Sequence, residues 1–209
     1  MMMIKKLKQL GLCLFTACIL SSCVQPPFNN FQSNQFNLEE SNSCDKPSVH
    51  SRAERDTIAR ATIRHLGAEA IQFVQRGDRM TLIVPTDRYY LFNSPDFDDT
   101  EFTALNNISK LVRLFPCSKI IVAGFSDNVG KQILQDRLSK ARADTMLTFL
   151  WAKGVPAQRL TAEGFGQRFP IGNNQLIHGS AYNRRIEIQW WTGKSAPPPP
   201  PMSEAMTTK

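Results

Sequence analysis

Three segments of the chain carry apolar residues at intervals of three to four, the spacing that places them on one face of a helix. These segments are residues 51–66, 99–115 and 131–153. Ser51 opens the first segment as a helix cap, and Gly154 follows the third, where a glycine typically ends a helix. The apolar faces of the predicted helices consist of Ile58, Ala61, Ile63 and Leu66; Phe102, Leu105, Ile108, Leu111 or Val112, and Phe115; and Leu134, Leu138, Ala141, Thr145 and Phe149.

Short runs rich in β-forming residues lie between and after these segments. Residues 70–85 predict two strands around a turn at Gly77-Asp78, and three later strands are expected at 119–125, 159–165 and 184–191. In the last run, isoleucine and tryptophan alternate with polar residues. Strands that alternate with helices predict an α+β domain, an α/β sandwich in which a small mixed sheet has helices packed on one face.

The amino terminus has the pattern of a secretory signal. Three lysines precede an apolar run over residues 10–20, which is too short to span a bilayer as a helix. Leu20-Ser21-Ser22-Cys23 resembles the lipobox of bacterial lipoproteins, which implies cleavage before Cys23 and its acylation. An ordinary signal peptide with an incidental cysteine is the alternative. Val24, rather than an acidic residue, follows the cysteine, and this resemblance implies the outer membrane, with the domain in the periplasm.

Four regions follow from these patterns: a signal peptide (1–22), a lipidated cysteine and tether (23–50), the domain with its preceding helix (51–191) and a Pro-rich disordered tail (192–209). The tether would span about 30 Å as a flexible coil and about 80 Å when straight. Its three phenylalanines could instead dock on a partner protein. Removing the signal lowers the formal charge from +7 to +4, and no run of Lys and Arg is dense enough to indicate nucleic acid.

Three cysteines remain after the predicted cleavage: Cys23, Cys44 and Cys117. If Cys23 carries lipid, Cys44 and Cys117 can pair in an oxidising compartment. The disulfide would contribute roughly 4 kcal/mol in the chain-entropy model and would tie the tether to the domain. The alternative is a buried thiol at Cys117 and an unpaired Cys44.

The sequence gives little sign of catalysis. The histidines are scattered, no Cys/His spacing indicates a metal site, and no Ser/His/Asp set appears. The Glu163-Gly164-Phe165-Gly166 stretch lacks the third glycine of a dinucleotide-binding loop. We therefore expect a binding protein that is not an enzyme and needs no cofactor.

A series of motifs over about residues 79–191 resembles the OmpA-like peptidoglycan-binding domain. The motifs occur in the family's order and with its usual gaps. They are Val122–Gly130, Leu138–Ala143, Gly154-Val155-Pro156, Arg159-Leu160, Gly164-Phe165-Gly166 and Asn183–Ile188. The resemblance implies non-covalent binding of the diaminopimelate in uncrosslinked peptidoglycan stems.

By position, the resemblance assigns Asp127 to the ammonium of the ligand and Arg142 to its carboxylate. The planar guanidinium of an arginine holds a carboxylate through two parallel hydrogen bonds. An ionised aspartate only accepts hydrogen bonds, so it suits an ammonium. The alternative is that Asp127 caps a turn and that Arg142 forms a surface ion pair with Asp136 or Asp144.

The predicted peptidoglycan site also includes Phe92, Asn93, Asn128 and Arg184. Arg184 could instead be a charge on an edge strand. Several positions depart from the family pattern, namely Phe125 for the usual His, Ser126 for the usual Thr, Gln135 for the frequent Asn and Ser180 for the common Arg. These departures leave both charged anchors but favour lower affinity or an altered preference among stem peptides.

Helix length raises a difficulty for this site. A straight helix from Lys131 would carry Arg142 about 16 Å further along its axis, away from Asp127. The site therefore requires that residues 128–136 fold back or that the helix begins near Asp136, and we expect an irregular or kinked start there.

A narrower resemblance links the chain to the small OmpA-like lipoproteins of Dot/Icm type IVB secretion systems. It depends on the lipobox, the short tether, the extra helix and the phrase LIVPTDRYYLFNS. It implies contacts with other subunits of a secretion complex, which the lipoprotein would fix to the cell wall. The alternatives are a general envelope tether of the Pal type, and a structural subunit that has lost or weakened peptidoglycan binding.

Overall fold

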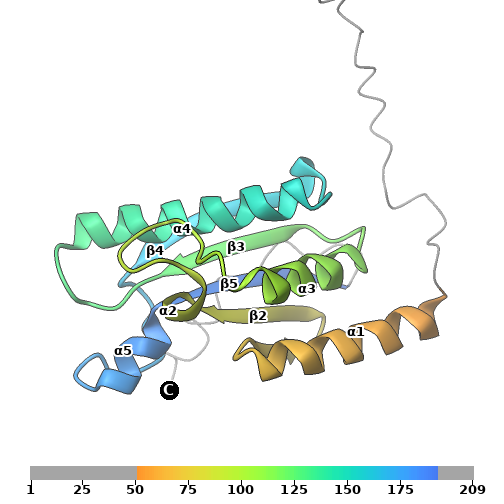
Figure 1. The fold of residues 1–209 in the computed structure, drawn as a ribbon, viewed down its shortest axis with the longest axis horizontal. Helices are drawn as coiled ribbons and strands as arrows, with labels where there is room; N and C mark the ends of the chain where they lie inside the picture. Colours follow the sequence, from red (N-terminus) through yellow and green to blue (C-terminus); the bar gives the residue numbers. More distant parts are fainter. Residues whose placement is uncertain (1–50, 193–209) are drawn as a thin grey trace, which may run out of the picture. The chain divides into compact units, whose positions relative to one another are not determined.

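The computed structural model describes residues 51–192, and within them five strands form one mixed sheet (Figure 1). The strands are β1 (Gln72–Arg76), β2 (Arg79–Pro85), β3 (Ile120–Phe125), β4 (Leu160–Gly166) and β5 (Arg185–Trp191). Their order in the sheet is β1-β2-β5-β3-β4. Only the β3–β4 pair is parallel. The last strand of the sequence is therefore the central strand, and the predicted mixed sheet is confirmed.

Three long helices account for the helical segments that the sequence predicts. They are α1 (Arg52–Ala68), α3 (Phe102–Arg113) and α4 (Gln132–Ala152). Two short helices and a single 3-10 turn were not predicted: α2 (Thr86–Tyr89), α5 (Ile177–Asn183) and η1 (Ala157–Arg159). Within residues 51–192 no helix has both the length and the apolar run needed to cross a bilayer.

Alternation along the strands sends one set of side chains toward the long helices. On β5 these are Ile186, Ile188 and Trp190, and all three are fully buried. They lie beside Leu82 and Val84 of β2, and the same cluster includes residues of α1, α3 and α4. Each such side chain contributes about 1.5–3 kcal/mol on burial, so this face of the sheet forms the core of the domain.

Two glycines let α4 lie directly on the sheet. A Cβ on Gly124 would be 2.0 Å from the backbone oxygen of Ser139, and one on Gly164 would be 2.6 Å from the backbone nitrogen of Lys140. The middle of α4 therefore rests on the carboxyl ends of β3 and β4. Its first turns are exposed, with Ile133 at 56% and Leu134 at 55%. Figure 1 shows the chain leave β3, loop outward and return along α4.

Cys117 lies on the surface as an exposed free thiol. The expectation that an unbridged Cys117 would be buried is therefore wrong. Its predicted partner, Cys44, lies outside the described residues, as do Cys23, the signal peptide, the whole tether and, apart from Thr192, the Pro-rich tail. The disulfide and the lipid attachment remain predictions.

Candidate functional site

A pocket of about 850 Å³ opens at the carboxyl end of β3. Its walls come from three parts of the chain: residues 86–93, the loop 126–131, and the first half of α4, with Arg184 at the start of β5. Apolar side chains surround the opening, namely Leu91, Phe92, Val129, Leu134 and Leu138. Charged and hydroxyl groups lie among them, namely Thr86, Asp87, Ser126, Asp127, Lys131, Arg142 and Arg184.

Arg142 enters the pocket from the middle of α4 and is only 6% exposed. Its Nε donates to the carbonyl oxygen of Ser94 at 2.9 Å, and its Nη1 donates to Oγ1 of Thr86 at 3.3 Å. The guanidinium carbon lies 5.6 Å from the ring centre of Tyr90. Nη2 makes no hydrogen bond to any described residue. Arg142 is therefore held rigidly, with one nitrogen left for a ligand.

Burial lowers the pKa of Arg142, because the cation has lost water, while the nearby Tyr90 and Asp87 oppose this shift. Within residues 51–192 no carboxylate forms an ion pair with this guanidinium. A desolvated cation without a direct counterion attracts an anion strongly, since the cost of removing its water has already been met by folding. The position suits an incoming carboxylate.

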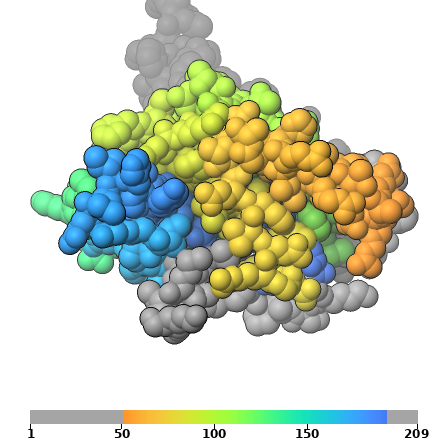
Figure 2. Space-filling model, turned by 90° about the horizontal axis from the view of Figure 1, so that it is seen from below, coloured from red at the N-terminus to blue at the C-terminus, as the bar shows by residue number. Residues whose placement is uncertain are grey.

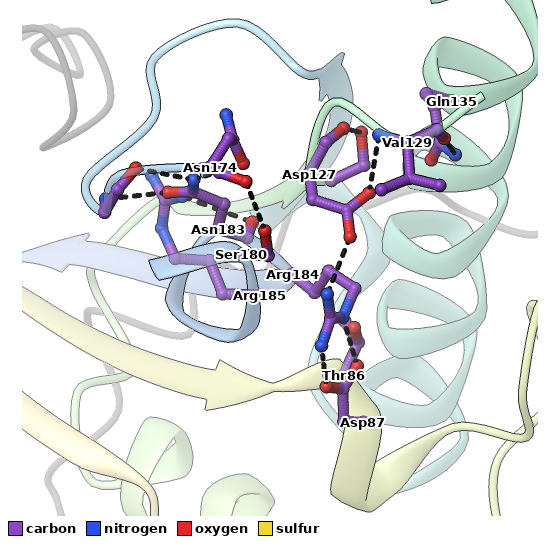
Figure 3. A network of polar contacts seen from close by, with 12 residues as sticks. Thr86, Asp87, Asp127, Val129, Gln135, Asn174, Ser180, Asn183, Arg184 and Arg185 are labelled. Carbon is purple, nitrogen blue, oxygen red and sulfur yellow. Dashed lines mark hydrogen bonds and ion pairs between the residues drawn. The ribbon is translucent and has the colours of Figure 1, made fainter. Parts of the chain in front are cut away.

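Asp127 follows β3 directly and is also only 6% exposed. Its Oδ1 accepts from the backbone N–H of Val129 at 3.1 Å, and its Oδ2 accepts from Nη1 of Arg184 at 2.6 Å (Figure 3). One oxygen of the carboxylate therefore caps a local turn, as one alternative supposed. The other oxygen faces the guanidinium across the pocket wall.

Arg184 links two carboxylates. Its Nε donates to Oδ1 of Asp87 at 2.7 Å and its Nη2 donates to Oδ2 of the same residue at 2.5 Å, while Nη1 bonds Asp127. Figure 3 shows the guanidinium between the two acids. The hydrogen bonds to Asp87 are the main reason that the pKa of Arg184 is raised above its ordinary value. Arg184 is thus a fixed cation at the pocket, and the interpretation as a simple edge-strand charge is wrong.

The prediction of an irregular or kinked start to α4 is wrong. The helix runs regularly from Gln132 to Ala152, yet Asp127 and Arg142 line the same pocket. The two residues would be far apart only if the helix began at the strand end. Instead the loop carries the chain outward, and the first turns of α4 project beyond the sheet before Ser139 lies over Gly124. The helix therefore returns to the end of β3 at about the position of Arg142.

The alternative ion pairs of Arg142 are also wrong. Asp136 lies 3.8 Å from Nη2 of Arg168, and Asp144 pairs with Lys140 at 2.5 Å on the exposed side of α4. Since Arg142 is on the buried side, it cannot reach either partner without leaving the pocket.

Of the other predicted residues, Phe92 and Asn93 line the pocket and Asn128 does not. Phe92 is fully exposed at the rim, and Asn93 has a left-handed backbone with a φ of 52°. Asn128 is exposed on the loop. Thr86 and Asp87 were not predicted as site residues, and the single turn of α2 places them beside the two arginines.

Asn183, the residue before Arg184, organises the loop in front of β5. Its Oδ1 accepts from the backbone N–H groups of Ile171 and Gly172, and its Nδ2 donates to the carbonyl oxygen of Gly172 at 2.8 Å. Ser180, where the family commonly has an arginine, donates to the carbonyl oxygen of Asn174 (Figure 3). Asn183 itself is fully buried, so this network fixes the point from which Arg184 leaves the sheet.

The pocket holds charges of both signs: Arg142 and Arg184 are cations, and Asp127 and Asp87 are anions. Such an arrangement suits a small zwitterion, because each ligand charge would meet an opposite and oriented partner. Residues 51–192 contain no group of three or more His, Cys, Asp and Glu side chains that could hold a metal ion.

Comparison with known proteins gives three relevant likenesses. Residues 89–184 match the model of the OmpA family. The chain is 30% identical over 118 residues to the probable lipoprotein YiaD of Escherichia coli, an alignment that covers 56% of this chain and 54% of YiaD. It is 31% identical over 88 residues to the peptidoglycan-binding protein ArfA of Mycobacterium tuberculosis, covering 42% of this chain and 27% of ArfA.

Among solved structures, the fold resembles the cell wall anchor of the T6SS from Pseudomonas aeruginosa. The TM-score is 0.59 at 28% identity, and the match covers 66% of this chain and 99% of the anchor. The chain thus spans about half of YiaD and a smaller part of ArfA, whereas it matches nearly all of the solved anchor domain.

Proposed function

Because this chain contains an OmpA-like domain, we propose that it binds peptidoglycan non-covalently through the diaminopimelate of the stem peptide. The observation that carries the proposal is the pair Asp127 and Arg142, each 6% exposed, on the walls of one pocket. Both side chains are fixed by neighbours before any ligand arrives, so little conformational entropy is lost on binding.

The pocket suits the free end of diaminopimelate, which bears an ammonium and a carboxylate on one carbon. The carboxylate meets Nη2 of Arg142, and the ammonium lies against the carboxylate of Asp127. An amine that has been used in a cross-link is an amide and carries no charge, so it makes no charge-assisted bond to Asp127. The site therefore selects uncrosslinked stems.

The lipobox-like segment Leu20-Ser21-Ser22-Cys23 supports an outer-membrane location for this activity. Cleavage before Cys23 and its acylation anchor the chain in that membrane, with the domain in the periplasm; YiaD is itself named a probable lipoprotein. Two or more acyl chains give durable anchoring where one alone is marginal. The protein then links the outer membrane, or an envelope complex within it, to the cell wall.

Binding to purified sacculi tests the peptidoglycan proposal. The parent protein is expected to co-sediment with sacculi, and Asp127→Asn and Arg142→Lys are each expected to weaken binding at least tenfold. Asp144→Asn and Arg137→Lys are matched controls, since both residues lie on α4 outside the pocket and should leave binding unchanged. A parent protein that stays in solution contradicts the proposal.

One observation favours a second function, that of a structural subunit in a type IVB secretion outer-membrane complex. Phe125 replaces the usual histidine at the end of β3 and is buried in a stack with Phe165, at 5.2 Å between ring centres. This ring does not line the pocket, so the second function rests on the departure from the family pattern and not on a lost ligand contact. A parent that fails to bind sacculi but co-purifies with secretion subunits would support this function.

A further inference from the structure

Asp87 is placed at the pocket by the pairing of two antiparallel strands. Pro85, the last residue of β2, lies opposite Arg185, the first residue of β5. The backbone N–H of Thr86 donates to the carbonyl oxygen of Arg184 at 3.0 Å, which continues the pairing by one step. Residues 87 and 184 therefore leave the sheet at the same end and meet there, although 97 positions separate them in the sequence.

The two acids hold different sides of the Arg184 guanidinium (Figure 3). Asp87 accepts from Nε at 2.7 Å and from Nη2 at 2.5 Å, so its carboxylate takes one whole edge of the planar fork. Asp127 accepts only from Nη1, at 2.6 Å. Of the two acids, Asp87 contributes more to the raised pKa of Arg184. Arg184 is therefore bound mainly by Asp87, and Asp127 receives a single hydrogen bond from it.

This division leaves part of the Asp127 carboxylate unused. An ionised carboxylate offers roughly four acceptor positions. Within residues 51–192, the backbone N–H of Val129 takes one position on Oδ1 and Arg184 takes one on Oδ2. About half of the acceptor positions thus remain for a ligand. If Arg184 turned its two-nitrogen edge toward Asp127, it would occupy more of these positions and would pair with the full charge of the acid.

We propose that Asp87 is a positioning residue that makes the pocket selective for an ammonium group. It holds the two-nitrogen edge of Arg184, which prevents a bidentate pair between Arg184 and Asp127 and keeps Asp127 available as an acceptor. It also balances charge, because Arg184 together with Asp87 is neutral and Asp127 then keeps a net negative charge for the ligand. The inference rests on the proposed function, since the ammonium is the one at the free end of diaminopimelate.

Asp87 performs this role without touching the ligand. Both of its oxygens are bonded to Arg184. Its side chain is 49% exposed, whereas that of Asp127 is 8% exposed. Water therefore screens the charge of Asp87 far more than that of Asp127, and a direct attraction to the ligand would be weak. Because Asp87 acts through Arg184, its removal should matter only while Arg184 is present.

A crystal structure of Asp87→Ala tests the geometry without any ligand. We expect the guanidinium of Arg184 to turn so that two of its nitrogens bond Asp127. Glu69→Ala is the matched control, because it removes another exposed carboxylate, the partner of Arg88 on α2, at a position outside the pocket. It should leave Arg184 in place. An Arg184 that keeps its position in Asp87→Ala, or that turns into solvent, overturns the proposal.

Titration calorimetry with two soluble muropeptides tests the selectivity. One muropeptide carries diaminopimelate with a free amine, and the other is the same peptide with that amine acetylated. We expect Asp87→Ala to weaken binding of the first at least about tenfold and binding of the second less than about twofold, because only the first brings an ammonium to Asp127. Glu69→Ala should change neither affinity. Equal losses for both muropeptides would indicate a structural defect, and this outcome or an unchanged affinity for the first muropeptide overturns the proposal.

A double-mutant cycle tests the dependence on Arg184. In the Arg184→Gln background, adding Asp87→Ala should change the affinity for the free-amine muropeptide by less than about twofold. A loss of about tenfold in that background would mean that Asp87 contacts the ligand directly, and the proposal would be wrong. A parent protein that binds neither muropeptide contradicts the proposed function, and the crystal structure of Asp87→Ala then decides the role of Asp87 by itself.

Discussion

Arg142 and Arg184 differ in how their charges are used, although both are held at one pocket. Arg184 bonds two carboxylates, Asp87 and Asp127, and so serves to fix the pocket wall. Arg142 bonds only neutral oxygens, those of Ser94 and Thr86, and sits against the ring of Tyr90. The residue without a counterion is therefore the one that has most to gain from an anionic ligand.

Replacing Arg142 with lysine tests this difference at the level of one functional group. Arg142→Lys keeps the positive charge and removes the planar fork. Hydrogen bonds to charged groups contribute about 1.5–3 kcal/mol, so binding of a diaminopimelate-containing muropeptide is expected to weaken by about 10- to 100-fold. Isothermal titration calorimetry measures the change. Equal affinity for Arg142→Lys and the parent would show that the fork does not contact the ligand.

Tyr89 gives the domain a pH-dependent contribution to stability. Its ring is fully buried, and its hydroxyl donates to the carbonyl oxygen of Glu69. Burial raises its pKa to about 12, above the ordinary value of about 10. Because the folded-state pKa is the higher one, the stabilisation is complete below pH 10 and is lost as the pH rises through 12.

We therefore expect Tyr89→Phe to lose about 1 kcal/mol of unfolding free energy relative to the parent at pH 8, and this deficit to vanish near pH 11. Urea unfolding at several pH values measures the deficit in unfolding free energy at pH 8 and the pH at which it disappears. Tyr182→Phe serves as the control, since Tyr182 is 58% exposed. A deficit for Tyr89→Phe that stays constant from pH 8 to 11.5 would contradict the assignment.

At the level of elements, the pocket forms because α4 packs across the carboxyl end of β3. The loop after Asp127 carries the chain outward, and α4 returns over Gly124 so that Arg142 reaches the strand end. This return depends on the absence of a side chain at two strand positions. The family motifs that contain these glycines are therefore packing signals as much as binding signals.

The close approach of α4 can be tested by adding one methyl group. In Gly124→Ala the new Cβ would be 2.0 Å from the backbone oxygen of Ser139, so α4 must shift, at a cost of about 1–3 kcal/mol or more. In Gly67→Ala the new Cβ meets open space on α1, and alanine is the better helix former, which predicts a gain of about 0.5–1 kcal/mol.

Chemical denaturation of both variants measures these changes, and binding to sacculi should fall for Gly124→Ala because Arg142 moves with the helix. Unchanged stability and binding in Gly124→Ala would mean that the strand and helix are not in direct contact.

At the level of the whole molecule, one face of the sheet packs against the long helices to form the core, and the pocket lies at the carboxyl end of β3. In Figure 2, β1 and β2 lie at the front with α1 beside them, away from the loop between α4 and β3. The helix α1 therefore lies apart from the pocket.

The predicted disulfide would affect the whole molecule, because it would join the tether to the domain. If Cys44 and Cys117 are bridged, thiol titration of the denatured, unreduced protein should find no free thiol, and Cys117→Ser should lower the unfolding free energy by roughly 4 kcal/mol. Two titratable thiols, together with an unchanged stability in Cys117→Ser, would show that both cysteines are unpaired. The exposed position of Cys117 leaves room for such a bridge.

The sequence by itself determined those helices and strands that are long enough for their apolar residues to repeat at regular intervals. The three long helices and the alternating β5 could be predicted because burial on one face imposes a repeat that many positions report. The ordered motifs also pointed to Asp127 and Arg142, which line one pocket in the structure. No such signal exists for α2 and α5, which are single turns or little more, and so Asp87 was missed.

Only the tertiary structure decided which of these groups meet. The bond between Arg184 and Asp87 joins residues 97 apart, and the overhang of α4 depends on where its middle rests on β3. Local preferences are set by neighbours within a few residues, whereas such contacts depend on strand order and on how closely two backbones approach. The physical reason is that packing of distant segments, and not local propensity, fixes the geometry of the pocket.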